Sequence, residues 1–165
     1  MKFVSIIMGS KSDLEVMREC ESILKELGIA YEMIISSAHR TPKRTAEYVQ
    51  EATNKGAEVF ICAAGMAAHL AGAVAANTIK PVIGVPMFSN TLSGADALYS
   101  TVMMPGGIPV ATVAIGKAGA KNAAYLAAQI LATSDEELAK KLKVNREQSA
   151  KNVESDSKSI EVRIK

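Results

Sequence analysis

Residues Phe3–Gly28 read FVSIIMGSKSDLEVMRECESILKELG and hold one complete strand–loop–helix pattern. The segment Phe3–Met8 is apolar on successive residues, which is typical of a strand covered on both faces of a parallel sheet. Over Asp13–Leu27 the apolar residues recur every three or four positions, as in a helix with one buried face, and Gly28 is suited to end that helix. The stretch therefore predicts a βα unit in which a polar loop joins the strand to the helix.

The same pattern repeats along the chain. Strands are predicted at Phe3–Met8, Tyr31–Ser36, Val59–Ala63, Val82–Val85 and Val110–Ile115. Helices are predicted at Asp13–Leu27, Thr41–Lys55, Ala67–Asn77, Gly94–Val102 and Ala118–Ala132. Strands that alternate with helices in this way predict an α/β fold, namely a single-domain, three-layer, doubly wound parallel sheet of flavodoxin-like type.

The end of the chain has a different composition. The whole chain, with 165 residues, has the length of one domain of ordinary size. The run Ser134-Asp135-Glu136-Glu137 has the pattern of a capping box and predicts a last helix, with a narrow apolar stripe, that frays near Ser155. We expect residues 1–133 to form an α/β catalytic domain. Residues 134–165 are expected to form a C-terminal helix and tail of the same domain, lying on its surface or docking on a partner.

Composition excludes several classes of protein. Hydrophobic residues make up 48% of the chain and the mean hydropathy is +0.13, which excludes intrinsic disorder for most of it. A net charge of +2 gives no reason to expect nucleic acid or an acidic membrane surface as a partner. No basic start precedes an apolar run, so no secretory signal is predicted. Cys20 and Cys62 lack CxxC spacing and are interpreted as reduced thiols of a cytoplasmic protein.

One stretch raises the alternative of a membrane helix. Residues 59–79 contain no charged side chain and are long enough to span a bilayer. However, the stretch contains Gly65, His69 and Asn77, and polar groups inside a membrane are costly. Its pattern also changes midway, from a buried strand to an alanine-rich helix that begins after Met66. We therefore favour a strand followed by a helix over a transmembrane segment.

The middle of the chain is poor in charge and in aromatic residues. Between Val59 and Ile115 the only charged side chains are Lys80 and Asp96. The whole chain has four Tyr, three Phe and no Trp, so small residues must close the interior. One soluble surface normally carries more charge than this. We expect other subunits to cover much of this surface in a homo-oligomer.

Three polar loops follow the first three predicted strands. In an open parallel sheet, ligands bind beyond the carboxyl ends of the strands. The loop Gly9–Asp13 precedes a helix, and the N–H groups at a helix start bind phosphate. The loop Ser36–Pro42 offers His39, which titrates near neutrality, and Arg40, whose forked donors suit phosphate or carboxylate. The third loop carries the other histidine of the chain, His69. Polar and stiff uncharged segments further on, Ser89–Asp96 and Met104–Pro109, resemble walls for a substrate.

Structural roles are the alternative for several of these residues. Ser12 and Glu15 match a capping box, and Asp13 is a candidate acceptor for ribose hydroxyls. His69 lies in an apolar segment, where a hydrogen-bonded core histidine is the commoner case. Asp96 is a candidate cap for its helix. Packing roles are expected for three methionines: Met66, Met103 and Met104.

The chain has no zinc ligand set, no Walker loop, no Gly-x-Gly-x-x-Gly fingerprint and no signature of a Schiff-base lysine. The remaining chemical groups are imidazoles, an arginine, hydroxyls and backbone amides. Together they predict cofactor-free proton transfer on a phosphorylated small molecule.

Motifs spread over most of the chain carry a specific resemblance. They are Met8–Asp13, Ser37–Pro42, Ala67–Leu70, Leu92–Gly94, Tyr99–Ser100, Met104–Pro109 and Ala114–Gly119. With these motifs, collinear from about Val4 to Ala132, the sequence resembles the purine-biosynthetic N5-carboxyaminoimidazole ribonucleotide mutase family. These proteins are AIR carboxylase catalytic subunits of the class I type.

The resemblance implies a reaction, an assembly and a set of site residues. The reaction moves the carboxylate from the exocyclic nitrogen of aminoimidazole ribonucleotide to ring carbon 4, through trapped carbon dioxide and without metal or other cofactor. The assembly is a homo-octamer with its sites near subunit contacts. Ser10, Asp13 and Arg40 would hold the ribose 5-phosphate of this small-molecule substrate. His39 would be the general acid and base. The pocket for base and carboxylate would be lined by Ser37, Gly65, His69 and Leu70.

The chain departs from the family pattern at two positions and leaves other functions open. The family's third loop commonly reads Gly-Gly-Ala-Ala-His-Leu-Pro-Gly, whereas here Met66 replaces the second glycine and Ala71 replaces the proline. A related branch carboxylates aminoimidazole ribonucleotide directly with carbon dioxide. That branch tends to carry Lys after the histidine, so Arg40 favours the mutase. The further alternatives are a non-catalytic nucleotide- or flavin-binding module, which the few aromatic residues disfavour, and a structural oligomeric shell.

Overall fold

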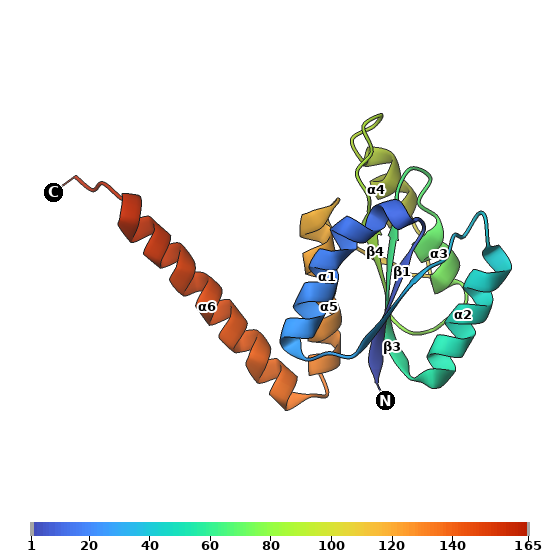
Figure 1. Cartoon of the computed structure of the whole chain (residues 1–165), viewed down its shortest axis with the longest axis horizontal. Helices are drawn as coiled ribbons and strands as arrows, with labels where there is room; N and C mark the ends of the chain where they lie inside the picture. The colour runs from blue at the N-terminus through green and yellow to red at the C-terminus, as the bar shows by residue number, and fades with distance from the viewer. Residues whose placement is uncertain (1, 165) are drawn as a thin grey trace.

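A computed structural model describes residues 2–164 and contains one five-stranded parallel sheet with helices on both faces (Figure 1). The strands are β1 (Phe3–Met8), β2 (Tyr31–Ile35), β3 (Ala57–Ala64), β4 (Val82–Pro86) and β5 (Ala111–Thr112). Their order in the sheet is β2-β1-β3-β4-β5, and every neighbouring pair is parallel. This order confirms the predicted doubly wound α/β fold, in which ligands bind where the strand order reverses.

Helices alternate with the strands as predicted, but several of them begin or end at other residues than expected. They are η1 (Lys11–Asp13), α1 (Leu14–Leu27), α2 (Pro42–Lys55), α3 (Leu70–Ala75), α4 (Ala95–Val102), α5 (Lys117–Ala132) and α6 (Glu136–Ile160). Helices α1 and α5 pack on one face of the sheet, and α2 and α3 pack on the other.

Strand β1 lies inside the sheet, between β2 and β3, and its position explains why its sequence is apolar on successive residues. All six of its residues are buried. Val4 and Ile6 belong to the core shared with α1 and α5, whereas Phe3 and Ile7 belong to the core shared with α2 and α3. Ser5 is the one polar residue of the strand, and its hydroxyl bonds to the Tyr48 hydroxyl at 2.9 Å. Side chains that alternate between two covered faces produce the continuous apolar run.

Small residues let the elements of this core approach closely. Ala120, Ala123, Ala124 and Ala127 of α5 are completely buried. At Gly119, an added Cβ atom would lie only 1.6 Å from the backbone oxygen of Ala114. The interior is therefore closed by close backbone approach, which replaces the large aromatic area that the sequence lacks.

Two predicted elements are shorter than expected. β5 covers Ala111–Thr112 instead of Val110–Ile115, because it is an edge strand that pairs with β4 alone. α3 covers Leu70–Ala75 instead of Ala67–Asn77, because the residues before Leu70 form a loop held by other contacts. In this loop the Ala68 N–H donates to the Ser100 hydroxyl at 2.9 Å.

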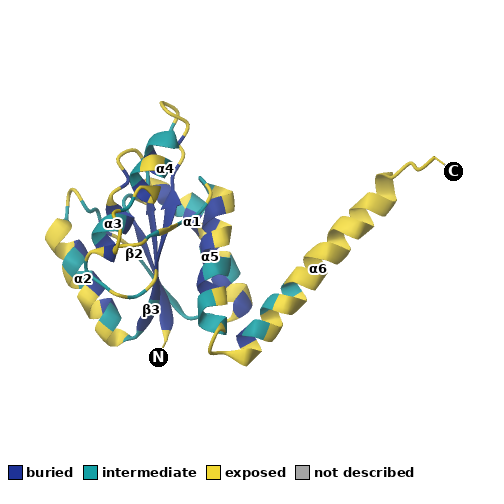
Figure 2. Ribbon diagram, turned by 180° about the vertical axis from the view of Figure 1, so that it is seen from behind, coloured by how far each residue is buried: buried dark blue, intermediate teal, exposed yellow. Residues whose placement is uncertain are grey.

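Helix α6 differs from its prediction at both ends. Its N-cap is Asp135, whose side chain accepts from the Leu138 N–H at 3.0 Å, so Ser134 does not cap it. The helix does not fray near Ser155 but continues to Ile160. Leu138 packs against Leu27 and Ala128. Leu142 packs against the same cluster, and Asn145 donates to Glu26 at 3.4 Å. The rest of the helix stands away from the body of the molecule (Figures 1 and 2).

The alternative of a membrane helix at residues 59–79 is wrong. This stretch contains most of β3, a loop and the whole of α3, and no single helix covers it. Within residues 2–164, we find no helix that combines the length and apolar character needed to cross a bilayer.

Candidate active site

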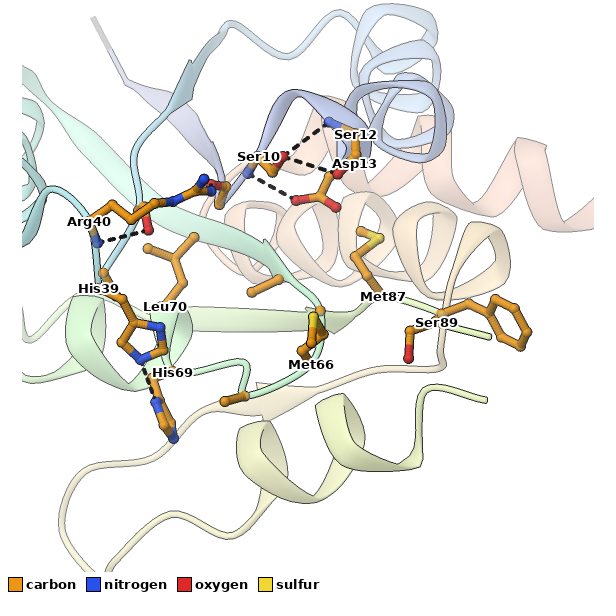
Figure 3. Close-up of a pocket in the computed structure, with 17 residues that line it drawn as sticks. Ser10, Ser12, Asp13, His39, Arg40, Met66, His69, Leu70, Met87 and Ser89 are labelled. Carbon is orange, nitrogen blue, oxygen red and sulfur yellow. Dashed lines mark hydrogen bonds between the residues drawn. The ribbon is translucent and has the colours of Figure 1, made fainter. Parts of the chain in front are cut away.

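The loops that follow β1, β2, β3 and β4 surround one cavity of about 630 Å³ at the carboxyl edge of the sheet (Figure 3). All eight site residues predicted from the sequence line it: Ser10, Asp13, Ser37, His39, Arg40, Gly65, His69 and Leu70. Parallel strands end at a common edge, so loops that are distant in the chain meet there. The three polar loops expected after the first three strands therefore meet over one cavity, and the loop after β4 joins them.

The first loop is held by a reciprocal pair of hydrogen bonds. The Ser10 hydroxyl accepts from the Ser12 N–H at 3.3 Å, and the Asp13 carboxylate accepts from the Ser10 N–H at 3.2 Å. The capping box of this segment is thus Ser10 with Asp13, and the prediction of Ser12 with Glu15 is wrong. The turn η1 comes before α1, which moves the cap two residues toward the N-terminus.

Asp13 is a buried carboxyl on the wall of the cavity, with only 9% of the residue exposed. Burial raises the pKa of Asp13 above its ordinary value, because desolvation disfavours the charged form. Hydrogen bonds from Ser10 and Ser12 oppose this shift but do not cancel it. The carboxyl therefore holds a proton more readily than an exposed aspartate does.

The second loop is fixed by hydroxyl groups. The Thr41 hydroxyl accepts from the Ser37 N–H at 3.0 Å and lies 3.0 Å from the Ser37 carbonyl. The Ser37 hydroxyl accepts from the Arg40 N–H at 3.1 Å. Thr41 is the N-cap residue of α2, as predicted, but its side chain bonds to the loop and makes no hydrogen bond to the helix. These bonds hold the turn that presents His39 and Arg40.

Arg40 joins the second loop to the first. Its Nη2 donates to the Gly9 carbonyl at 3.2 Å, so the guanidinium lies across the mouth of the β1 loop. The guanidinium has five N–H donors in a planar fork, and this contact uses one of them. The rest remain available for an anion in the cavity.

The two histidines form a direct pair. Nε2 of His39 and Nδ1 of His69 are 2.7 Å apart, and the ring planes cross at 84°. One of these nitrogens donates and the other accepts, so the pair shares one proton between the rings. His69 is therefore not a core histidine: both rings are exposed in the single chain and line the cavity. Such a pair can pass a proton to a reacting group and take it back.

The methionines do not all pack in the core as predicted. Met66 is 68% exposed on the cavity wall, and Met103 is 80% exposed. Met104 is half-buried beside Gly72, where an added Cβ atom would lie 3.3 Å from its sulfur. Met66 also has a φ of 55°, in the left-handed region.

The loop after β4 supplies wall residues that sequence analysis missed. Met87 and Phe88 line the cavity together with Ser89, the only residue of the Ser89–Asp96 segment that does so. Their position at the carboxyl end of a strand was a usable signal. Asp96 does not cap α4, since the N-cap position is Gly94 and no side chain caps the helix. The segment Met104–Pro109 does not line this cavity.

The cysteines and carboxylates add no further site to the described chain. Cys20 and Cys62 are buried unpaired thiols in the cores on opposite faces of the sheet. Burial raises the pKa of Cys20 to about 12, so this thiol is unreactive at neutral pH. Among residues 2–164, no group of three or more His, Cys, Asp or Glu side chains is placed to hold a metal ion.

Known proteins match almost the whole chain. The family model described as AIR carboxylase matches residues 3–152. The N5-carboxyaminoimidazole ribonucleotide mutase of Bacillus subtilis is 55% identical over 150 residues, which cover 91% of this chain and 93% of that protein. The protein of the same name from Thermotoga maritima is 52% identical and covers 98% of this chain, with 93% of its own length matched.

Solved structures share the fold. The crystal structure of a single-residue variant of Treponema denticola PurE2 has a TM-score of 0.90 and 33% identity, covering 98% of this chain and 100% of that one. The crystal structure of Treponema denticola PurE has a TM-score of 0.88 and 34% identity, and it also covers 98% of this chain and 100% of that one. The sheet and its helices thus follow an architecture that is known from experiment.

Proposed function

The chain belongs to the AIR carboxylase family, and we propose that it has the activity for which its curated relatives are named, that of an N5-carboxyaminoimidazole ribonucleotide mutase. This isomerase moves the carboxylate from the exocyclic nitrogen of aminoimidazole ribonucleotide to ring carbon 4 in purine biosynthesis. The observation that carries the assignment is the cavity wall, where groups suited to phosphate and a pair of imidazoles face one hollow.

The phosphate end of the site is formed by the first two loops. Arg40 is anchored to the Gly9 carbonyl and keeps donors of its fork for the ribose 5-phosphate, with Ser10 beside it. Asp13 also faces this part of the cavity. Its carboxylate accepts from the Ser10 N–H, which fixes the loop beside the phosphate.

His39 is the general acid and base of the reaction. It protonates the exocyclic nitrogen, the bond from that nitrogen to the carboxylate carbon breaks, and carbon dioxide is released. Ring carbon 4 then attacks the carbon dioxide to form the new carbon–carbon bond. A base removes the proton from carbon 4, which restores the aromatic ring and returns the proton to the enzyme. Atoms and charge balance without an oxidant or reductant, and the contact with His69 at 2.7 Å gives the proton a second position.

The base and the carboxylate lie against the second and third loops. The Ser37 backbone and hydroxyl are fixed by Thr41 and Arg40, so this wall is rigid before substrate binds. Gly65 keeps the third loop close to β4, since an added Cβ atom would lie 3.3 Å from the Cβ of Met87. Leu70 supplies an apolar surface beside the imidazole pair.

The decisive experiment supplies two alternative substrates. The purified protein is given either N5-carboxyaminoimidazole ribonucleotide or aminoimidazole ribonucleotide with bicarbonate, and the ring-carboxylated product is followed by absorbance or chromatography. The mutase forms product from the first substrate without added bicarbonate. Turnover only with bicarbonate would instead identify a direct carboxylase, and no product from either would leave a non-catalytic binding module.

We further propose that the enzyme is a cytoplasmic homo-octamer whose sites lie near subunit contacts. Carbon dioxide is retained only where water is excluded, yet both histidines are exposed in the single chain. Phe88, Tyr99 and Met103 are 60%, 66% and 80% exposed close to this end of the sheet, and a second copy that covers them would close the chamber. Two buried unpaired thiols suit a reducing cytoplasm. The contact of Leu138 with Leu27 supports assigning residues 134–165 to the same domain as residues 1–133.

A further inference from the structure

Met66 occupies an unusual position on the cavity wall. Its φ of 55° lies in the left-handed region, which disfavours any residue with a Cβ atom. Its side chain is 68% exposed, so packing in the core does not account for it. In Figure 3 it lies on the wall between the imidazole of His69 and the side chain of Met87. A strained residue with an exposed side chain at a ligand cavity points to a role toward the ligand.

The surroundings hold this conformation in place. The Ala68 N–H donates to the Ser100 hydroxyl of α4 at 2.9 Å, and the Met66 carbonyl lies 3.3 Å from the same hydroxyl. The N–H of Met87 donates to the carbonyl of Ala64, just before the loop, at 2.9 Å. The backbone is thus fixed on both sides of Met66, and the side chain is carried toward the cavity whatever its own preference.

We propose that Met66 is a positioning residue of the mutase reaction, whose thioether closes one side of the cavity over the heterocycle and keeps released carbon dioxide beside ring carbon 4. This inference rests on the proposed function. A thioether is polarisable and flexible, and it makes favourable contacts with the edge of an aromatic ring. With Met87 on the same wall, it gives the imidazole pair an apolar neighbour that excludes water.

The role of Met66 can be measured from the fate of the released carbon dioxide, which either reacts with ring carbon 4 or escapes. Carbon dioxide forms when the nitrogen–carbon bond breaks and is consumed when the bond to carbon 4 forms. Any molecule that escapes in between leaves unsubstituted aminoimidazole ribonucleotide as a by-product. A residue that retains carbon dioxide therefore sets the ratio of by-product to ring-carboxylated product, which a purely structural residue does not change.

The chain offers a matched control for relief of backbone strain. Ser93 is the other residue besides glycine with a φ of 55° among residues 2–164, and it does not line the cavity. The test compares the wild type with Met66→Gly, Met66→Leu and Ser93→Gly. Each is given N5-carboxyaminoimidazole ribonucleotide, and both products are measured against a blank that corrects for spontaneous loss of carbon dioxide.

We expect Met66→Gly to raise KM and the by-product ratio together, each by about tenfold, a change ordinary for loss of a small apolar contact. Met66→Leu should restore most of the wild-type ratio, and Ser93→Gly should leave it unchanged. The thermal transition of Met66→Gly should be no lower than that of the wild type, because glycine accepts the left-handed backbone. Wild-type KM and ratio in Met66→Gly, or an equal shift in Ser93→Gly, would overturn the inference.

Failure of this inference and failure of the proposed function are distinguishable. If the wild type makes no ring-carboxylated product, the proposed function fails. The contact is then judged by titration calorimetry of aminoimidazole ribonucleotide, where Met66→Gly should bind about tenfold more weakly than Met66→Leu. Equal affinities would exclude a contact between Met66 and the heterocycle.

Discussion

His39 is the proposed general acid and base, and its Nε2 lies 2.7 Å from Nδ1 of His69 on the cavity wall. General acid–base groups contribute roughly 10²–10⁴-fold to rate. We expect His39→Asn to lower kcat by at least about 10²-fold, while affinity for aminoimidazole ribonucleotide changes only slightly. Arg40→Lys is the contrasting variant, since a point charge replaces a forked donor and should mainly raise KM. Steady-state kinetics separate the two effects, and near-normal kcat in His39→Asn would mean that another group transfers the proton.

Asp13 gives the protein a dependence of stability on pH. Burial raises the pKa of this carboxyl in the folded state, so the folded protein binds the proton more tightly than the unfolded chain does. The corresponding stabilisation is complete below the unfolded pKa and is lost as pH rises through the folded pKa. We expect Asp13→Asn to be more stable than the wild type at pH 7, with a difference that shrinks toward about pH 4. Urea unfolding at both pH values tests this, and a variant of lower stability at pH 7 would contradict it.

Sequence patterns could predict that the eight candidate residues line one cavity, because their position depends on topology. Each lies just beyond a strand, and parallel strands end at one edge. The capping box was assigned to the wrong pair because both Ser10–Asp13 and Ser12–Glu15 match the pattern, and only the turn η1 distinguishes them. The exposure of Met66 could not be predicted because it depends on how the third loop is folded, whereas hydropathy alone suggests burial.

At the scale of elements, the position of α5 depends on Gly119, whose lack of a side chain lets the helix approach the Ala114 backbone closely. Alanine normally favours a helix over glycine by about 1 kcal/mol, but at Gly119 its Cβ atom would overlap the Ala114 carbonyl. We expect Gly119→Ala to destabilise the protein in spite of this preference. The free energy of unfolding should fall by about 3 kcal/mol, because overpacking forces the backbone to shift. Urea unfolding measures the loss.

Gly106→Ala is the matched control for this prediction. No atom lies within 4 Å of an added Cβ there, and Gly106 is not among the glycines with positive φ. Its stability should stay within about 0.5 kcal/mol of the wild type. If Gly119→Ala were equally tolerated, close approach of α5 to the chain before it would not hold the helix in place.

The ends of elements show where sequence patterns stop being informative. The start of α2 at Pro42 and the glycine that ends α1 were both predicted, because these residues have local conformational preferences. The length of α6 was underestimated because its polar half has no apolar periodicity to follow. That half is supported locally, for example by Gln148, which donates to Asn152 at 2.9 Å.

At the scale of the whole molecule, the charge-poor middle of the chain predicts an assembly. We expect light scattering to give a mass near eight times 17.4 kDa. Tyr99→Glu places a charge on an exposed aromatic residue of α4 and should reduce both this mass and the turnover. Glu51→Lys, on the exposed surface of α2, is the control and should change neither. A wild type that is monomeric and fully active would refute the requirement for a covering subunit.

Helix α6 also decides where foreign sequence can be attached. Its 25 residues form a rod about 37 Å long, which contacts the body at Leu138, Leu142 and Asn145 near its start. A purification tag fused after α6 would lie at the tip of this helix, where it could contact neighbouring subunits of the proposed octamer. Strand β1 begins at the end of the sheet opposite the cavity (Figure 1), so a tag joined ahead of Phe3 emerges away from the substrate and from the far tip of α6. Protein prepared for kinetics or crystallisation should carry its affinity handle there.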